Sequence, residues 1–451
     1  MNLFGPNSDT IAQQLRSTNF TGEVFHGSST NQGAEAKLSG EIWQMAAGPV
    51  GLALGADYRK EKIDQNYNPV LSTDDVSGYG ETYQGVIASR ADTAFFAEVD
   101  VPLTKALEAN LAIRTDYYSD FGRTNNPKVS VRWQPGSRVL VRGSYGTGFL
   151  PPSLYELFVP LTRGLSAEGL SDPIRCPVTH DTGFDCITQF PIIHGGNPQL
   201  RPEQSENTTL GFVWEPANAV SLSFDYFKIR LKDIVVNGGI PVASILGNLD
   251  RFGYLVNRGP ADPAFPDLPG RITSIQGVFL NVGSVHVEGW DAEAHYRWPR
   301  RPWGRLRFDI TGTYYIRYDS QNLDGTYTGS VSNQIVSPFA GQVPRWKHYA
   351  SLSWDSGPWS ATLAQTYQSS YIDWGRDING DLRRASSMSL FDLQGQYTGF
   401  KNTTLTLGCK NIFDTNPPQT NQVALFPVGY DALYYDARAR FVYFSVRYAY
   451  K

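Results

Sequence analysis

The sequence predicts an all-β fold, a transmembrane antiparallel β-barrel with long loops at one end. Three observations predict it: apolar and polar residues alternate along most of the chain, the alternating segments are about 9–12 residues long, and tight and long connections alternate between them. The composition agrees, since aromatic residues make up 13% of the 451 residues and charged residues only 18%. No run of about 18 apolar residues is present, which excludes a membrane-spanning helix.

Alternation with a period of two residues gives a strand one apolar face and one polar face. In the segment 107–118, Leu111 and Ile113 share one face, whereas Arg114 and Asp116 share the other. The same pattern predicts further strands, of which the clearest lie at 34–46, 220–227, 289–298, 305–318 and 441–450. About fifteen such strands can be counted along the chain.

A soluble β-sandwich also alternates, so the alternation does not decide the fold by itself. Strands of 9–12 residues match tilted strands that cross a bilayer, whereas ordinary strands average about 5–6 residues. Tyrosine and tryptophan lie near the ends of the apolar faces, as the interfacial girdle of a membrane barrel requires. The residues expected in this girdle are Trp290, Trp298, Tyr448 and Tyr450.

The opposite faces carry charged residues in mid-strand, which suits a water-filled lumen. The alternative for most of these charges is simple solvation on a polar wall. The side chains expected to face the lumen are Arg114, Asp116, Arg132, Arg142, Asp225, Asp291, Glu293, Arg307, Asp309 and Arg317.

The connections predict which end of the barrel faces out of the cell. Bacterial outer-membrane barrels have short periplasmic turns and long extracellular loops. The short connections lie at 47–50, 102–105, 134–137, 215–219, 298–304, 355–358 and 399–402. The long connections lie at about 64–91, 119–127, 147–204, 231–284, 319–345, 371–387 and 411–438.

The strand count raises a question about the start of the chain. The strand at 34–46 precedes a tight turn, so residues 1–33 are expected to be an extracellular loop remnant with a short helix capped by Ser8. Residues 34–451 are expected to form the barrel. Because bacterial single-chain barrels have an even number of strands, and because no signal peptide opens the chain, we expect a barrel that lacks its first part.

Four segments, in order, resemble one known family. They are AIRTDYYSDFGRTNNPKVSVRWQP (112–135), RGSYGTGFLPPSLYELF (142–158), GNPQLRPEQSENTTLGFVWEP (196–216) and KNIFDTNPP (410–418). Together with the terminal strand they resemble the C-terminal barrel of the TonB-dependent outer-membrane receptors, from about residue 33 to 451. Each motif alone is weak, whereas four in the correct order are specific.

The resemblance implies a 22-stranded barrel whose lumen is filled by an N-terminal plug domain. TonB acts on a short box in that plug, and the charged lumen residues hold the plug by hydrogen bonds and ion pairs. The cargoes that the resemblance implies are ferric siderophores, cobalamin, haem, other metal chelates and oligosaccharides. The sequence departs from the family pattern because the plug, the TonB box, the export signal and about seven strands are missing. TonB is therefore expected as a partner only through a plug domain missing here.

The longest loop contains the pair Cys176 and Cys186, in CPVTHDTGFDC. A disulfide between them suits an oxidising compartment. The alternative is a zinc site or a reactive thiol pair, although C-x9-C is not a zinc spacing. Cys409 is expected to be a lone thiol.

Aromatic residues in the long loops are candidates for an extracellular ligand platform, because aromatic rings stack on sugars and on catechols. The alternative is packing within the loops. The platform candidates are Tyr155, Phe158, Phe184, Phe190, Phe252 and Tyr254. Pro151 and Pro152 are expected to end a strand and shape a segment at the barrel mouth.

The leading functional prediction is energised uptake of a scarce ligand across the outer membrane, with outer-membrane lipid as the other partner. The alternative is a passive pore or a surface adhesin. An enzyme is not expected, because Asp291, Glu293 and His295 are explained by strand periodicity and the six histidines show no ligand spacing. We expect no cofactor, no metal site and, with a net charge of -4, no nucleic-acid partner.

Overall fold

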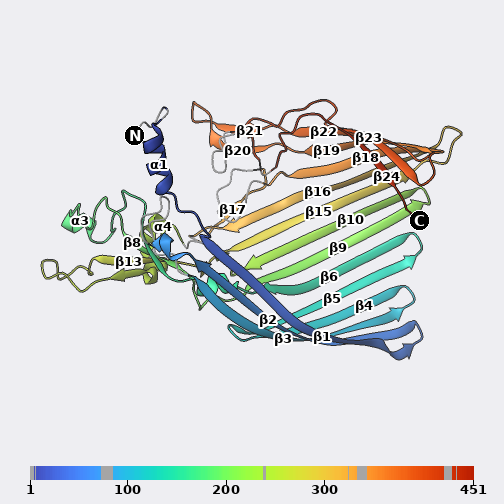
Figure 1. Ribbon diagram of the computed structural model, residues 1–451. Coiled ribbons are helices and arrows are strands. Elements are labelled where there is room, and N and C mark those ends of the chain that lie inside the picture. Colours follow the sequence, from blue (N-terminus) through green and yellow to red (C-terminus); the bar gives the residue numbers. More distant parts are fainter. Residues whose placement is uncertain are drawn as a thin grey trace.

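A single large antiparallel sheet dominates the computed structural model (Figure 1). Fifteen of its strands neighbour one another in sequence order, and a sixteenth short strand, β17 (Tyr327–Gly329), pairs with β16. The structure describes residue 5 and residues 7–72, 85–236, 240–323, 325–332, 343–420, 429–432 and 434–450. Among these residues, no helix is both long and apolar enough to cross a membrane.

The long strands agree with the sequence prediction in number, but many are longer than the expected 9–12 residues, and β1 reaches 21 residues. They are β1 (Phe25–Met45), β2 (Gly48–Tyr67), β3 (Val86–Thr104), β4 (Leu107–Tyr118), β5 (Gly122–Gly136), β6 (Val139–Leu150), β9 (Glu203–Ala217), β10 (Val220–Lys232), β15 (Ser284–Arg297), β16 (Arg305–Gln321), β18 (Trp346–Ser356), β19 (Trp359–Gln368), β22 (Met388–Tyr397), β23 (Thr403–Lys410) and β24 (Phe441–Tyr448). In the described residues β1 pairs only with β2 and β24 only with β23, so these two strands form opposite edges of the sheet.

The tight and long connections lie at opposite ends of the sheet (Figure 1). The seven tight turns fall where the sequence predicts them, and six of the seven long connections are long. The exception is 119–127, because β5 already begins at Gly122 and only three residues separate it from β4. The first strand also begins earlier than expected, at Phe25, in a segment whose two faces are both polar and which therefore shows no clear alternation. Residues 73–84 of the 64–91 connection lie outside the described part of the chain.

Two of the long connections fold together into what we call the loop subdomain, which comprises the described residues of 151–202 and 233–283. Its small sheet has the order β12-β13-β8-β7 and joins both connections, because β8 pairs in parallel with β13. Its elements are α2 (Leu154–Phe158), β7 (Thr162–Leu165), α3 (Cys176–Thr179), β8 (Pro191–Gly195), β11 (Val235–Val236), α4 (Val242–Gly247), α5 (Leu249–Phe252), η2 (Gly253–Leu255), β12 (Val256–Arg258), β13 (Ile272–Val278) and β14 (Leu280–Asn281). Figure 1 shows these elements clustered beyond one end of the large sheet.

The loop subdomain has a hydrophobic core of its own. Seven buried apolar side chains form one cluster: Phe190, Ile240, Ile245, Leu246, Phe252, Leu255 and Ile275. Burial of apolar side chains is the main favourable contribution to folding in water. The subdomain is therefore built like a small soluble domain, although it consists of loops.

Three further elements lie outside the large sheet and the loop subdomain. They are α1 (Asp9–Ser17), η1 (Pro69–Ser72) and the hairpin of β20 (Tyr371–Arg376) with β21 (Leu382–Ala385). The helix α1 begins directly after Ser8, as expected from the sequence, but the Ser8 side chain makes no capping hydrogen bond.

One face of the large sheet is apolar and exposed. Leu111 and Ile113 are 52% and 49% exposed, although a soluble protein would bury a face of this kind. Aromatic side chains cluster on this face, with Trp290 packed between Phe224, Tyr314 and Trp346. A second group lies at the short-turn end, where Trp298 packs on Tyr296 and Tyr448 on Tyr450. The four residues expected in the girdle thus lie in two levels along the strands.

Candidate functional site

The other face of the sheet carries a layer of charged side chains. Arg142 on β6 donates two hydrogen bonds to Asp225 on β10, at 2.9 and 2.7 Å, across the intervening strand β9. The residue between them is Gly211, where an added Cβ would lie 2.2 Å from the Asp225 Oδ1 atom and 2.6 Å from the Arg142 Nε atom. The missing side chain of this glycine therefore makes the cross-strand ion pair possible. The alternation predicts both charged residues on this face, but it does not single out Gly211.

The charges on β2, β3 and β4 form a connected network. Arg90 pairs with Glu61 at 2.8 Å and with Asp120 at 3.5 Å. It also donates a hydrogen bond of 2.6 Å to the Pro152 carbonyl oxygen at the start of the loop subdomain. The side chain of Arg90 is only 6% exposed, so this contact fastens the subdomain to the wall.

The remaining expected lumen residues also have polar partners. Arg114 contacts Asp116 at 2.8 Å, and Asp309 accepts a hydrogen bond from Arg307 and contacts His295. The other contacts of this group are those of Thr313 with Asp291, of Glu293 with His295, and of Arg132 with Gln134. Each of these charges therefore lies in a local pair or network on the sheet surface.

The prediction for Arg317 is wrong, because a β-bulge reverses the alternation in β16. In the ladder between β15 and β16, Arg317 lies opposite Glu288 and Tyr315 lies opposite Gly289. Ile316 between them has no residue opposite it. Two residues of a bulged strand face one residue of its neighbour, so the side chains beyond the bulge change face. Arg317 and Glu288 therefore lie on the same side of the sheet as Trp290, and not on the polar face.

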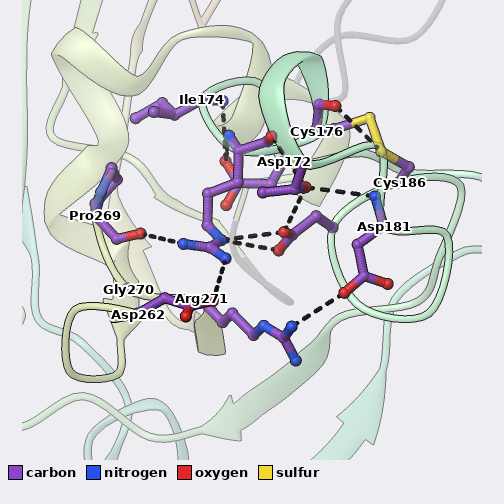
Figure 2. Close-up of polar contacts among 12 residues, drawn as sticks. Asp172, Ile174, Cys176, Asp181, Cys186, Asp262, Pro269, Gly270 and Arg271 are labelled. Carbon is purple, nitrogen blue, oxygen red and sulfur yellow. Dashed lines mark hydrogen bonds and ion pairs between the residues drawn. A yellow bond between two sulfur atoms is a disulfide. The ribbon is translucent and has the colours of Figure 1, made fainter. Parts of the chain in front are cut away.

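A fully buried arginine forms the centre of the loop subdomain. Arg175 contacts both oxygens of Asp185 at 3.1 Å, Asp262 at 3.2 Å and the Pro269 carbonyl oxygen at 2.8 Å. Its side chain has no exposed surface. Figure 2 shows how these contacts tie the region of Asp172 and Asp181 to that of Asp262 and Arg271, which comes from the other connection. A buried charge of this kind is tolerated only when it is paired and hydrogen-bonded.

Two further ion pairs join the same two connections. Arg258 contacts both oxygens of the buried Asp172, at 2.6 and 3.0 Å. Burial alone would raise the pKa of Asp172, but hydrogen bonds from Arg258 and from the backbone N–H groups of Ile174 and Arg175 hold this pKa below its ordinary value. On the surface, Arg271 pairs with Asp181 at 3.0 Å.

The cysteines lie next to this charged centre. Cys176 and Cys186 form a disulfide whose Cα atoms are 5.1 Å apart. The bond closes the segment that carries α3 and presents Asp181 and Asp185 to their arginine partners. Cys409 is a free thiol on β23.

The platform candidates divide into two groups. Phe190 and Phe252 are 2% and 3% exposed in the core of the loop subdomain, so the prediction that they contact a ligand is wrong. These loops show no alternation of apolar and polar residues, so the sequence does not distinguish buried from exposed aromatic side chains there. Exposed candidates remain: Tyr155, which packs on Phe279; Phe158; Tyr254; and Phe184, whose ring lies under the Arg271 guanidinium at 4.4 Å.

The helix α2 begins soon after Pro151, and a capping box determines where it starts. Ser153 caps α2 by accepting a hydrogen bond from the Glu156 backbone N–H, and the Glu156 carboxylate accepts one from the Ser153 backbone N–H. The sequence signal of this reciprocal capping box is the pattern S-x-x-E at 153–156. It starts the helix directly at the end of β6.

A second aromatic cluster lies among the other long connections. Tyr371 is fully buried and donates a hydrogen bond of 3.2 Å to Asp431, while Gln368 donates one of 3.1 Å to Tyr435. Burial raises the pKa of Tyr434 to about 12, and the Lys347 Nζ atom lies 4.7 Å from its ring. In the described part of the chain, no group of three or more His, Cys, Asp or Glu side chains could hold a metal ion.

Comparison with known proteins assigns this architecture to a family. The family model described as "TonB dependent receptor-like, beta-barrel" matches residues 2–412. An iron-regulated outer membrane virulence protein of Vibrio cholerae is 22% identical over 396 residues, which cover 86% of this chain and 49% of that protein. The chain thus spans about half the length of the curated relatives it matches.

Solved structures agree on the fold. A mutant ferric enterobactin receptor of Pseudomonas aeruginosa in complex with enterobactin superposes with a TM-score of 0.66 at 19% identity, covering 94% of this chain and 54% of that one. The siderophore receptor PirA of Acinetobacter baumannii gives a TM-score of 0.64 at 14% identity, with 94% and 55% coverage. The family consists of receptors and transporters of the outer membrane rather than enzymes. The chain therefore belongs to the TonB dependent receptor-like β-barrel family and is an outer-membrane β-barrel protein.

Proposed function

We propose that this chain is the barrel part of a receptor that takes up a scarce ligand, with a ferric siderophore as the ligand class. The observation that carries the proposal is the loop subdomain, in which two connections share one core and one buried charge cluster. Ordered loops held on a rigid scaffold are where binding residues concentrate. The subdomain is fastened to the wall through Arg90 and Pro152, so that a ligand on it is held at the barrel mouth.

The relatives support the choice of ligand class. The Vibrio cholerae relative is iron-regulated, and two structural neighbours are siderophore receptors, one of them bound to enterobactin. The exposed aromatic rings and cations of the subdomain, among them Tyr155, Tyr254 and Arg271 above Phe184, suit an aromatic and anionic chelate. Cobalamin and oligosaccharides are the other ligand classes. Uptake assays with these compounds would distinguish them from a ferric siderophore.

Energised transport is proposed for the complete receptor to which this barrel corresponds. In such a receptor the charged residues on the polar face, Arg142 and Asp225 among them, contact a plug domain on which TonB acts. The apolar face, with its two aromatic levels, contacts outer-membrane lipid. The segment before β1 is proposed to lie on the extracellular side, and the chain from Phe25 onward to form the barrel and its loops.

Uptake by iron-starved cells tests the proposal. A strain from which the gene is deleted is compared with the complemented strain for uptake of ⁵⁵Fe bound to a catecholate and to a trihydroxamate siderophore, with and without a protonophore. We expect one of the two chelates to enter only the complemented strain, and to stop entering when the protonophore is added. Uptake that continues without a proton gradient would indicate a passive pore, and unaltered uptake in the deletion strain would contradict a receptor for these ligands.

A further inference from the structure

The wall of the barrel opens locally between β5 and β6. Their ladder ends at the pair Lys128 and Gly146, although β5 continues to Gly122 beside β4 and β6 continues to Leu150 beside β9. The first β5 residue beyond the last pair is Pro127, which has no N–H group to donate to a ladder. The two strands therefore separate at the long-loop end of the sheet.

The separation leaves a cavity of about 400 Å³, a size that falls within the usual range for small-molecule sites. Six uncharged side chains with hydrogen-bonding groups line it: Thr124, Asn125, Asn126, Thr147, Gln204 and Ser205. They come from β5, β6 and β9. Amides and hydroxyls both donate and accept hydrogen bonds, so this lining can match a ligand that offers donors and acceptors together.

Two aromatic rings add an apolar wall. Phe121 and Phe149 both line the cavity. Phe121 stacks on Tyr118 at 4.5 Å, and Phe149 packs edge-on against the same ring at 5.9 Å. Tyr118 thus holds both rings in place, and a ligand with an apolar face can pack on them.

The charges around the cavity are largely compensated. Lys232 pairs with Glu206 at 2.5 Å and Arg201 pairs with Asp233 at 2.6 Å. Arg123 lies over the ring of Tyr117 at 5.9 Å. A cavity of this composition does not favour a polyanion, because only one of its cations lacks a carboxylate partner among the described ion pairs.

We propose that this cavity is a saccharide-binding site in the barrel wall, at the border with the loop subdomain, which contributes Arg201 and Pro202 to its lining. Neutral donors and acceptors recognise sugar hydroxyl groups, while Phe121 and Phe149 pack on the apolar face of the ring. Two sources offer this chemistry at the extracellular rim: the sugar part of a glycolipid in the surrounding leaflet, and a free oligosaccharide. The proposal does not depend on the identity of the transported ligand.

The test uses the full chain folded in detergent micelles and two probes prepared from one source. The first probe is rough lipopolysaccharide, and the second is its core oligosaccharide after removal of the lipid part. The variant Gln204→Ala removes a side chain that lines the cavity, and Phe149→Ala removes part of the aromatic wall. The matched control is Gln32→Ala, an exposed glutamine on β1 away from the cavity. Circular dichroism melting verifies that each variant is folded.

We expect binding that weakens roughly 3- to 10-fold in Gln204→Ala and in Phe149→Ala, as the loss of one hydrogen bond or contact implies, and that stays unchanged in Gln32→Ala. If both probes show this pattern, the site recognises the saccharide itself. If only the intact lipopolysaccharide shows it, the site recognises a glycolipid. Binding that is equal in all variants, binding of neither probe, or displacement by inorganic pyrophosphate but not by the oligosaccharide would each overturn the proposal.

Discussion

The barrel wall and the loop subdomain achieve order by different means. The wall consists of long ladders whose apolar face is exposed, with Leu111 and Ile113 about half accessible. The loop subdomain instead buries Ile245 and Ile275 completely and places Arg175 among carboxylates. In a membrane, the wall is held by backbone pairing that lipid cannot replace. The subdomain stands in water and depends on individual side chains, so single substitutions should affect it far more.

The largest effect is expected for Arg175→Leu. This change leaves Asp185 and Asp262 without their shared guanidinium, and breaking a buried pair costs about 3–5 kcal/mol. We expect hydrogen exchange to become fast throughout 151–202 and 233–283 while the wall strands stay protected. The control is Arg163→Leu, an exposed arginine of the same subdomain. Loss of protection in the wall would show that the two regions are not independent.

A matched pair of truncations sharpens the comparison. Ile245→Ala opens a cavity in the core of the subdomain and should cost about 2–5 kcal/mol of local stability. Leu111→Ala removes an exposed side chain from the apolar face and should cost less than about 1 kcal/mol, because no cavity results. Protease cleavage of folded protein in micelles measures both. Equal effects of the two substitutions would contradict the distinction between the regions.

These two regions also differ in how far the sequence predicts them. Alternation and turn chemistry predict the strand number, the tight turns and the positions of most charges on the polar face. They fail where the period breaks: Ile316 adds one residue to β16 and moves Arg317 to the other face. They also miss Gly211, because a single glycine in a strand has many interpretations until its neighbours Arg142 and Asp225 are placed.

The loop subdomain was much less predictable. Its sequence contains short elements from two connections, and only the tertiary fold brings Asp172 beside Arg258, 86 residues away. No local sequence pattern distinguishes the buried Phe190 and Phe252 from the exposed Phe184. Cysteine spacing, by contrast, is a local feature, and the pair Cys176 and Cys186 was accessible to sequence reasoning.

Removal of the disulfide should have a smaller effect than loss of Arg175. The double substitution of Cys176→Ser and Cys186→Ser releases a short loop, which corresponds to roughly 2–3 kcal/mol in the chain-entropy model. We expect faster hydrogen exchange near α3 only, with the core around Ile245 unaffected. Collapse of the whole subdomain in this variant would mean that the bond, rather than the charge cluster, holds the two connections together.

The smallest expected effect is a pH dependence confined to the subdomain. The pKa of Asp172 is lowered in the folded state, so its ion pair with Arg258 contributes stability above the ordinary aspartate pKa, and this contribution is lost as the pH falls through the lower folded value. Hydrogen exchange at pH 7 and at decreasing pH below about 4 should show progressive loss in the wild type. In Asp172→Asn the stability should be lower at pH 7 and vary less with pH. A wild-type subdomain that is equally stable throughout would contradict the role of this pair.

The central claim is that the loop subdomain receives the ligand for an outer-membrane receptor barrel. The most direct measurement is binding of ⁵⁵Fe-siderophores, one catecholate and one trihydroxamate, to energy-depleted whole cells that carry the wild type, Arg175→Leu or the control Gln32→Ala on β1, outside the loop subdomain. A blot of the outer-membrane fraction normalises the amount of receptor. We predict that one chelate binds the wild type and Gln32→Ala but not Arg175→Leu. Equal binding by all three strains would contradict the account, because the barrel would then bind its ligand without an ordered loop subdomain.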